Sequence, residues 1–150
     1  YDIHAPKENI IVRKGMRIKG YVRPSYVEST LGLVNAKFAK LIVSTDMARA
    51  VVKYYLKVNV TDANGKTIPG AKVEIINEVD NQNYPAEKDG NLWVLADYVQ
   101  DKASKKEFTY TVEVITPDGR KASLKGINPD ASWYRREGKN KAMTIKVAVK

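Results

Sequence analysis

The sequence predicts an all-β protein whose larger part is an antiparallel β-sandwich. From residue 53 onward, short runs of alternating apolar and polar residues recur, which is the pattern of strands that bury one face. Turn-forming pairs such as Asn64-Gly65 separate these runs, and none of them has sustained helical spacing. The 150 residues suffice for one domain that buries about two thirds of its unfolded surface.

A strand-rich extension, residues 1–51, is predicted to precede the sandwich. Within it, residues 16–23 alternate apolar and basic side chains until Pro24 ends the run. Residues 26–43 fit either a helix or short strands, and we favour strands because Gly32 weakens a helix at its centre. We expect this extension to pack against the sandwich or against a neighbouring molecule.

The sandwich itself is predicted over residues 52–150. Its clearest strand places Leu56, Val58 and Val60 on one face, because side chains alternate across a strand. The charged segment 97–107 is predicted to be mainly a loop. The expected strands are residues 52–60, 71–76, 92–95, 108–115 and 143–149.

An ordered set of motifs follows the first of these strands. Residues 56–75 contain a Val-x-Asp-x-x-Gly turn, a Pro-Gly-Ala bend and a second Val-containing strand. An Asp-Gly hairpin signal at 89–90, a Tyr-x-Val strand at 110–114 and a Gly turn at 118–119 come next. This order resembles the carboxypeptidase-regulatory-like domain, a transthyretin-like, immunoglobulin-like β-sandwich. The resemblance covers residues 52–150 and implies the fold more strongly than any function.

The resemblance also implies a location outside the cell. Such domains often follow β-rich segments in large secreted surface proteins of archaea and bacteria. On this interpretation residues 1–51 are either the last rungs of a preceding β segment or an exchangeable strand. Because the sequence starts at Tyr1 without Met, we expect a processed mature protein or a fragment of a longer one.

The composition argues against an enzyme. The chain has no Cys and a single His, His4, which excludes thiol nucleophiles, Cys-ligated metals and sites that need two imidazoles. It contains no phosphate-binding Gly-rich loop, metalloprotease motif or nucleophile elbow. We therefore expect a non-catalytic protein without a cofactor. The lack of Cys does not fix the compartment, since an exported protein of a thermophile can also lack it.

The net charge of +9 is unevenly distributed along the chain. Residues 1–55 carry a net charge of +6, residues 56–119 carry −4, and residues 120–150 carry +7. This pattern fits a Lys-rich solvated surface, a polyanion-binding surface, or contact between the basic ends of one copy and the acidic middle of another.

Two sets of aromatic residues are candidate contacts to a polymer or another ligand. Trp133, Tyr134, Arg135 and Arg136 combine rings for stacking with cations for phosphate. The alternative for the first set is that Trp133 caps the sandwich while Arg135 and Arg136 lie in solvent. Trp93 is a candidate for stacking on a sugar ring, and core packing explains it at least as well. No recognised nucleic-acid module surrounds them, so nucleic acid is not the expected partner.

Other polar motifs give weaker signals. Asn59 begins an Asn-Val-Thr sequon, which indicates N-glycosylation if the protein is exported by an organism with that machinery. Asp62, Asn64 and Gly65 match part of a calcium loop, but a tight turn explains them better because further ligands do not follow at the required spacing. A convergence of loop carboxylates into a cation site is a less favoured alternative to solvated side chains; these are Asp80, Glu87, Asp89, Asp97 and Asp101.

These observations together favour a non-catalytic extracellular structural or adhesive domain, such as a subunit of a cell-surface filament or layer. The alternative is a carbohydrate-binding accessory module, with a polysaccharide as its ligand. The expected partners are other copies of the chain or other domains of the same surface protein. No apolar run approaches the roughly 20 residues of a membrane-spanning helix.

Assembly of such a filament by strand exchange requires a donor strand. The alternating segment 10–22 is the candidate, because an edge strand accepts a further strand through main-chain hydrogen bonds. Pairing of this segment within its own chain is the alternative, and we favour it slightly. The apolar residues of the candidate donor are Ile10, Val12, Met16, Ile18 and Val22.

Overall fold

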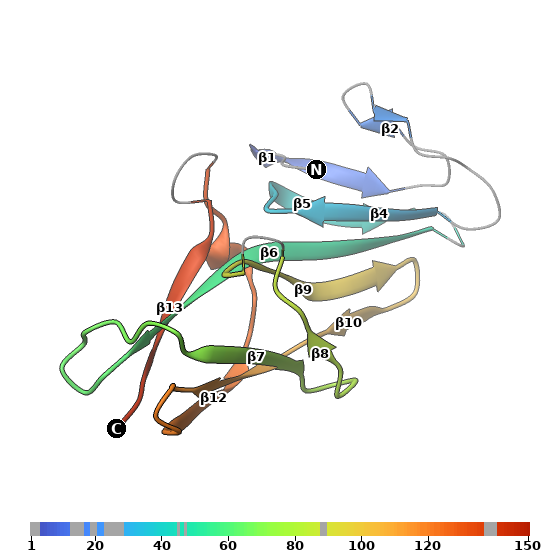
Figure 1. Cartoon of the computed structure of the whole chain (residues 1–150). Coiled ribbons are helices and arrows are strands. Elements are labelled where there is room, and N and C mark those ends of the chain that lie inside the picture. The colour runs from blue at the N-terminus through green and yellow to red at the C-terminus, as the bar shows by residue number, and fades with distance from the viewer. Residues whose placement is uncertain are drawn as a thin grey trace.

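The computed structural model confirms that the protein is all-β (Figure 1). It describes residues 4–12, 17–18, 21–22, 29–44, 46, 48–87, 90–136 and 141–150. These residues form thirteen strands and one turn of 3-10 helix, η1 (Ala131–Trp133). No helix among them is long and apolar enough to cross a membrane.

The first sheet is built around β6 (Ala48–Thr61), the longest strand of the described chain. Antiparallel β9 pairs with one edge of β6, from Arg49 to Leu56. On the other edge, parallel β4 (Ser29–Val34) pairs with the first half of β6, and parallel β13 pairs with the second half. The remaining strands of this sheet are β9 (Trp93–Asp101), β10 (Lys105–Glu107) and β13 (Met143–Ala148).

The second sheet is antiparallel throughout and lies against the second half of β6 in the sandwich (Figure 1). Its inner face contributes Ile75, Tyr110 and Val112, each with a fully buried side chain. The strands, in spatial order, are β12 (Lys121–Ile127), β11 (Tyr110–Ile115), β7 (Lys72–Asn77) and β8 (Asn83–Tyr84).

One predicted loop was wrong. Residues 97–107 are mostly strand, because β9 continues to Asp101 and β10 pairs with it. The four residues that precede Asp101 are half-buried, so their polar groups remain hydrated while the backbone pairs with β6. Backbone pairing with a long neighbouring strand thus extends β9 beyond its apolar part.

The N-terminal region forms what we call the parallel coil: β1, β4, β5 and the first half of β6. β1 (His4–Val12) pairs in parallel with β5 (Lys37–Val43), and β4 pairs in parallel with β6. After the separate β2–β3 hairpin, the chain therefore alternates between the β1–β5 sheet and the first sheet, from β4 to β5 to β6. In the segment 26–43, the described residues from 29 on form the short strands β4 and β5, which we favoured over a helix.

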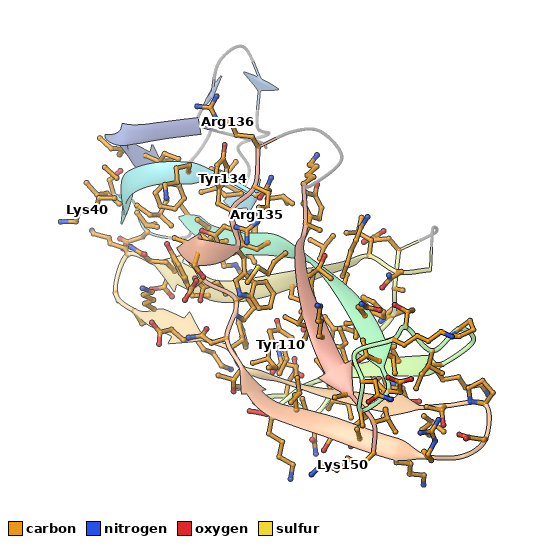
Figure 2. All side chains as sticks on the ribbon, turned by 90° about the vertical axis from the view of Figure 1, so that its left-hand side faces the viewer. Lys40, Tyr110, Tyr134, Arg135, Arg136 and Lys150 are labelled. Atoms are coloured by element: carbon orange, nitrogen blue, oxygen red, sulfur yellow. The ribbon has the colours of Figure 1, made fainter. Side chains whose placement is uncertain are left out.

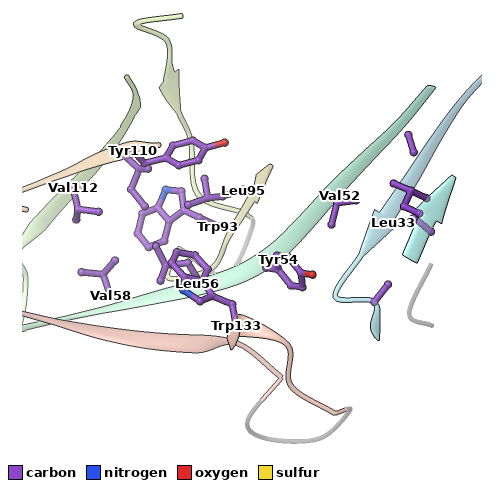
Figure 3. Close-up of a cluster of buried hydrophobic side chains, with 14 of the residues drawn as sticks. Leu33, Val52, Tyr54, Leu56, Val58, Trp93, Leu95, Tyr110, Val112 and Trp133 are labelled. Carbon is purple, nitrogen blue, oxygen red and sulfur yellow. The ribbon is translucent and has the colours of Figure 1, made fainter. Parts of the chain in front are cut away.

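One hydrophobic core runs from the parallel coil into the sandwich. Figure 3 shows Leu33 and Val52 at one end of this cluster and Val58 and Val112 at the other. Every second residue of β6 is buried in it, as the alternation predicts, namely Ala48, Ala50, Val52, Tyr54, Leu56, Val58 and Val60. The domain boundary that we expected, between residues 51 and 52, lies inside β6.

Candidate functional site

A groove of about 780 Å³ opens between the second half of β6 and the β7–β8 hairpin. It forms because β9 stops following β6 at Leu56, which pairs with Trp93. The apolar part of its lining is Val58, Val60, Ile68, Ala71, Val73, Tyr84, Pro85, Ala86 and Trp93. The polar residues of the lining are Asn59, Thr67, Glu74, Asn83 and Asn91, with two glycines completing it.

The groove-facing edge of β6 is capped at two points. The side-chain Oδ1 of Asn91 accepts a hydrogen bond from the Val58 N–H at 3.2 Å. The Val60 carbonyl accepts another from the Ile68 N–H at 2.8 Å. Successive residues of a strand direct their backbone groups to opposite edges. Between these two hydrogen bonds, only about one residue of the groove-facing edge is therefore free to pair with another strand.

The wall opposite β6 is held in place by buried contacts. The Trp93 indole N–H donates to the Tyr84 carbonyl at 3.1 Å. The Tyr84 ring meets Tyr110 edge to face, with 5.7 Å between the ring centres. At the end of the groove, the Thr67 hydroxyl donates to the Asn59 Oδ1 at 3.0 Å. The groove is thus preformed by the fold.

The described lining carries a single ionisable carboxylate, Glu74, and no Lys or Arg. This is notable in a chain with 26 Lys and Arg residues and a net charge of +9. None of the described lining residues would supply a cation to offset the desolvation of a bound anion.

Both tryptophans that we considered as ligand contacts belong to the core. Trp93 is 3% exposed and Trp133 is 5% exposed. Figure 3 shows their rings on either side of Leu56 from β6. An indole ring buried this deeply cannot stack on a sugar or a base unless the core unpacks. Trp93 still contributes to the floor of the groove, whereas Trp133 does not line it.

The three residues after Trp133 lie next to the parallel coil (Figure 2). Tyr134 is half-buried, and the Lys37 ammonium lies 5.9 Å from the centre of its ring. The Arg135 guanidinium donates to the Ser132 carbonyl at 2.6 Å and to the Met143 Sδ at 2.7 Å, so it bonds to its own segment and to β13. Arg136 is exposed. The structure therefore separates the Trp133 ring from the cations that follow it.

The candidate donor strand pairs within its own chain among the described residues. Ile10 is buried opposite Leu41 of β5, and Val12 is opposite Val43. Ile18 and Val22 belong to a two-stranded hairpin formed by β2 (Arg17–Ile18) and β3 (Tyr21–Val22). Met16 lies outside the described residues. Exchange of this segment between chains stays a prediction.

The Asn59 sequon lies within a paired strand. Asn59 is half-buried opposite Lys146 of β13, and Thr61, the third residue of the sequon, is 2% exposed. Its glycosylation stays a prediction.

The candidate carboxylates serve separate local turns. Asp62 accepts backbone hydrogen bonds from Asn64 at 2.9 Å and Lys66 at 3.0 Å, which is the turn we favoured over a calcium loop. Asp80 and Asp101 accept in the same way within their own loops. Asp89 lies outside the described residues, and the described part of the chain contains no group of three His, Asp or Glu that could hold a metal.

Among the described carboxylates, Asp97 has a pKa well above the ordinary value. Its side chain is half-buried on β9, and burial raises its pKa to about 6 even though Lys105 lowers it. The nearby carboxylates of Asp130 and Glu107 raise it further. The adjacent Tyr98 has its own pKa raised to about 12, again mainly by burial. These groups lie apart from the groove, and we assign them no ligand.

Comparisons with family models, with curated proteins and with solved structures found no match for this chain. The resemblance of residues 52–150 to a carboxypeptidase-regulatory-like domain therefore depends on the quoted motifs alone.

Proposed function

We propose that this chain is a non-catalytic structural domain of an extracellular surface protein, with the parallel coil as the last rungs of a longer parallel β-structure. The main support is the parallel pairing of strands that are separated by other strands in the chain: β1 pairs with β5, and β4 pairs with β6. Chains that stack such coils extend by adding one coil to the next. The sandwich then ends the stack through the shared strand β6.

A further strand would add at β1, which has a neighbour on only one edge among the described strands. That strand comes either from a preceding coil or from another copy of the chain, as in a surface filament. Backbone hydrogen bonds would supply most of the affinity. The alternative of a carbohydrate-binding module gains no support from Trp93 and Trp133, because both rings are buried.

The orientation of β1 identifies the residue that controls this edge. The Leu41 carbonyl accepts from the Gln100 side chain at 3.2 Å, so the backbone groups of Leu41 point away from β1. In a parallel pair the residue opposite, Ile10, then points its backbone groups toward β5. Ile11 consequently points its N–H and C=O toward the open edge, and its side chain is 50% exposed.

The test is light scattering of the whole chain over increasing concentration. We expect its mass to rise through strand addition, and we expect Ile11→Pro to stay monomeric because proline removes the outward N–H. Ile11→Thr, which retains that N–H, is the matched control and should assemble. A wild-type chain that stays monomeric, or an Ile11→Pro variant that assembles equally well, would contradict assembly at β1.

A further inference from the structure

We propose that the outer face of the first sheet binds an acidic polysaccharide. This face is the side of β4, β6, β9, β10 and β13 that points away from the hydrophobic core, and we call it the basic face. The proposal goes beyond the structural role inferred above, because it assigns a ligand to a surface other than the edge of β1. It does not use the buried rings of Trp93 and Trp133.

The alternation of β6 determines which of its side chains lie on the basic face. Every second residue from Ala48 to Val60 is buried in the core, so the residues between them lie on the opposite side of the strand. On that side a cation recurs every fourth residue, as Arg49, Lys53 and Lys57. These three cations extend over roughly 26 Å of the strand.

The neighbouring strands add two lysines to the basic face. Lys146 of β13 lies opposite Asn59 of β6. Lys106 of β10 lies opposite Val99 of β9, which in turn lies opposite Val51 of β6. Residues opposite one another in a ladder lie on the same face of the sheet, so both lysines lie on the outward side of β6.

Lys141, two residues before β13, adds a further cation. Its ammonium lies 4.9 Å from the centre of the Tyr55 ring, and Tyr55 is another outward residue of β6. A cation above an aromatic ring is held by the negative potential of the ring face. The aromatic ring that β6 presents on the basic face is therefore already in contact with a cation.

The carboxylates of these strands are mostly on the other side of the sheet. Glu107 lies opposite Tyr98, which in turn lies opposite the buried Val52, so it is on the core side. Asp97 is the extra residue where the register of β9 shifts, and it acts on the buried Tyr54. Burial, followed by the charge of Asp97, raises the pKa of that phenol.

The basic face therefore has a large excess of positive charge. The carboxylate on this side is that of Asp101, which lies opposite Arg49 and offsets its charge. Within the part of the chain that the structure describes, Lys53, Lys57 and Lys146 make no ion pair. A polyanion would supply the missing counter-charges.

The outer face of the second sheet does not share this excess. Its outward lysines, Lys72 and Lys121, lie on either side of Ile115. Its outward glutamates, Glu74 and Glu113, lie opposite each other on the neighbouring positions of the same strands. The positive charge of the sandwich is thus concentrated on one face, and the corresponding face of a second copy is not the acidic partner that the basic face would need.

The basic face lacks the features by which proteins bind nucleic acids or enter membranes. Base stacking requires exposed rings, whereas Tyr55 is half-buried beneath the Lys141 ammonium. Membrane insertion requires exposed apolar side chains. Among the described residues, the exposed large apolar side chains lie on other surfaces; these are Ile11, Val79, Ile115 and Leu124.

The type and spacing of the cations favour an acidic polysaccharide. Lysine is a point charge without the planar fork of arginine, so it pairs with a carboxylate or a sulfate in several orientations. Cations four residues apart along β6 are separated by roughly 13 Å. Phosphates follow one another about every 3.4 Å along each strand of duplex DNA. A polysaccharide in which neutral atoms separate the anions matches the wider spacing better.

The test is binding of the whole chain to polygalacturonate and to dextran sulfate, with neutral dextran and a DNA duplex for comparison. Calorimetric titrations at increasing salt give the affinities. We expect both acidic polysaccharides to bind and neutral dextran not to bind. The affinity should fall as salt rises, because release of counterions from the polyanion drives the association.

Paired variants locate the binding on the molecule. We expect Lys53→Gln combined with Lys57→Gln to weaken binding to polygalacturonate by roughly tenfold or more and to make its salt dependence shallower. Lys72→Gln combined with Lys121→Gln is the matched control, because it removes the same charge from the outer face of the second sheet. The control should change the affinity by no more than about twofold, since salt screens distant charges.

A second pair keeps the test decisive if the first pair disturbs folding. Lys106→Gln combined with Lys146→Gln removes two exposed cations from the flanking strands and should also weaken binding. Equal losses in the basic-face and control pairs would overturn the proposal, because net charge alone would then drive binding. Tighter binding of the DNA duplex, or no binding to either acidic polysaccharide at low salt, would also overturn it. None of these results bears on assembly at β1, which light scattering measures separately.

Discussion

Asn35 and Arg135, one hundred residues apart in the chain, are joined by two reciprocal hydrogen bonds. The Asn35 Nδ2 donates to the Arg135 carbonyl at 2.5 Å, and the Arg135 N–H donates to the Asn35 Oδ1 at 3.0 Å. The side-chain amide thus pairs with the backbone as a neighbouring strand would. Because Asn35 lies in the turn between β4 and β5, the pair ties the parallel coil to the segment that leads into β13.

Replacement of Asn35 should separate two contributions to stability. Asn35 is 2% exposed, and its φ of 50° places its backbone in the left-handed region. Asn35→Gly keeps that conformation and loses the two hydrogen bonds, which we expect to lower the free energy of unfolding by about 2 kcal/mol. Asn35→Ala should lose about 1 kcal/mol more, because a Cβ is strained there.

Urea unfolding followed by circular dichroism measures both variants. Equal stabilities of the Gly and Ala variants would show that the left-handed backbone of Asn35 carries no cost for alanine. A wild-type stability in the Gly variant would show that the pairing with Arg135 contributes nothing.

Asp97 should make the protein less stable as the pH rises through 6. Its pKa in the folded protein, about 6, exceeds the roughly 3.9 of an unfolded Asp, so folding favours the protonated form. The stabilisation is complete below the unfolded value and is lost as pH rises through the folded value. Asp97→Asn should therefore raise the free energy of unfolding at pH 7 by about 1–2 kcal/mol, after allowance for partial hydration.

Unfolding of wild type and Asp97→Asn at pH 4 and pH 7 checks this expectation. The gain in the variant should shrink toward zero at the lower pH. A gain of the same size at both pH values would mean that something other than ionisation of Asp97 causes it.

Glu78 should have the opposite dependence on pH. Its carboxylate accepts from the hydroxyls of Thr109 and Thr111, each at 2.8 Å, and from the Gly126 N–H at 2.9 Å. These bonds, led by that of Gly126, lower its pKa. The stabilisation is present above the unfolded pKa and is lost as the pH falls through the folded value.

Glu78→Gln keeps the shape of the side chain but replaces one of the two acceptor oxygens with an NH2 donor. We expect it to be less stable than the wild type at neutral pH, and the difference should narrow in acid. Urea midpoints at pH values well above and about one unit below the ordinary pKa near 4 test this. A difference that widens in acid would contradict the assignment.

Trp133 should contribute strongly to the free energy of unfolding. Its ring packs in the core beside Leu56, so Trp133→Ala is expected to lower the free energy of unfolding by about 3–5 kcal/mol through lost packing and a cavity. Trp133→Phe, which fills part of that space, should lose less. Denaturant melts of the two variants give the comparison, and a near-neutral Trp133→Ala would place the ring outside the core.

The strands whose side chains alternate were predictable from the sequence. In β6, residues such as Leu56 and Val58 point inward while their neighbours stay half-buried, so the two-residue period can be seen in the sequence. The second half of β9 carries no such signal, because Asp97 and Gln100 are polar. There the pairing with β6 determines the strand.

Contacts between distant segments were not predictable in this way. Trp133 stands among polar residues, so its sequence context left both stacking on a ligand and packing against the sandwich open. The turn of η1 directs its ring into the core, while Arg136 is exposed. Neither the sequence around Asn35 nor the sequence around Arg135 indicates that these two residues pair. The groove likewise depends on segments that meet only after the two sheets have packed together.

Because β6 belongs to both parts of the molecule, it constrains how such a chain can be recombined in evolution. Recombination between residues 51 and 52 would divide β6, so each product would carry only half of the original strand. The newly joined half would then have to pair with the neighbours of the half that it replaces. A joint in the turn at 62–66, which Asp62 closes, leaves every strand whole. The smallest N-terminal segment that can be exchanged without dividing a strand therefore ends at Thr61, the last residue of β6, and it includes one wall of the groove.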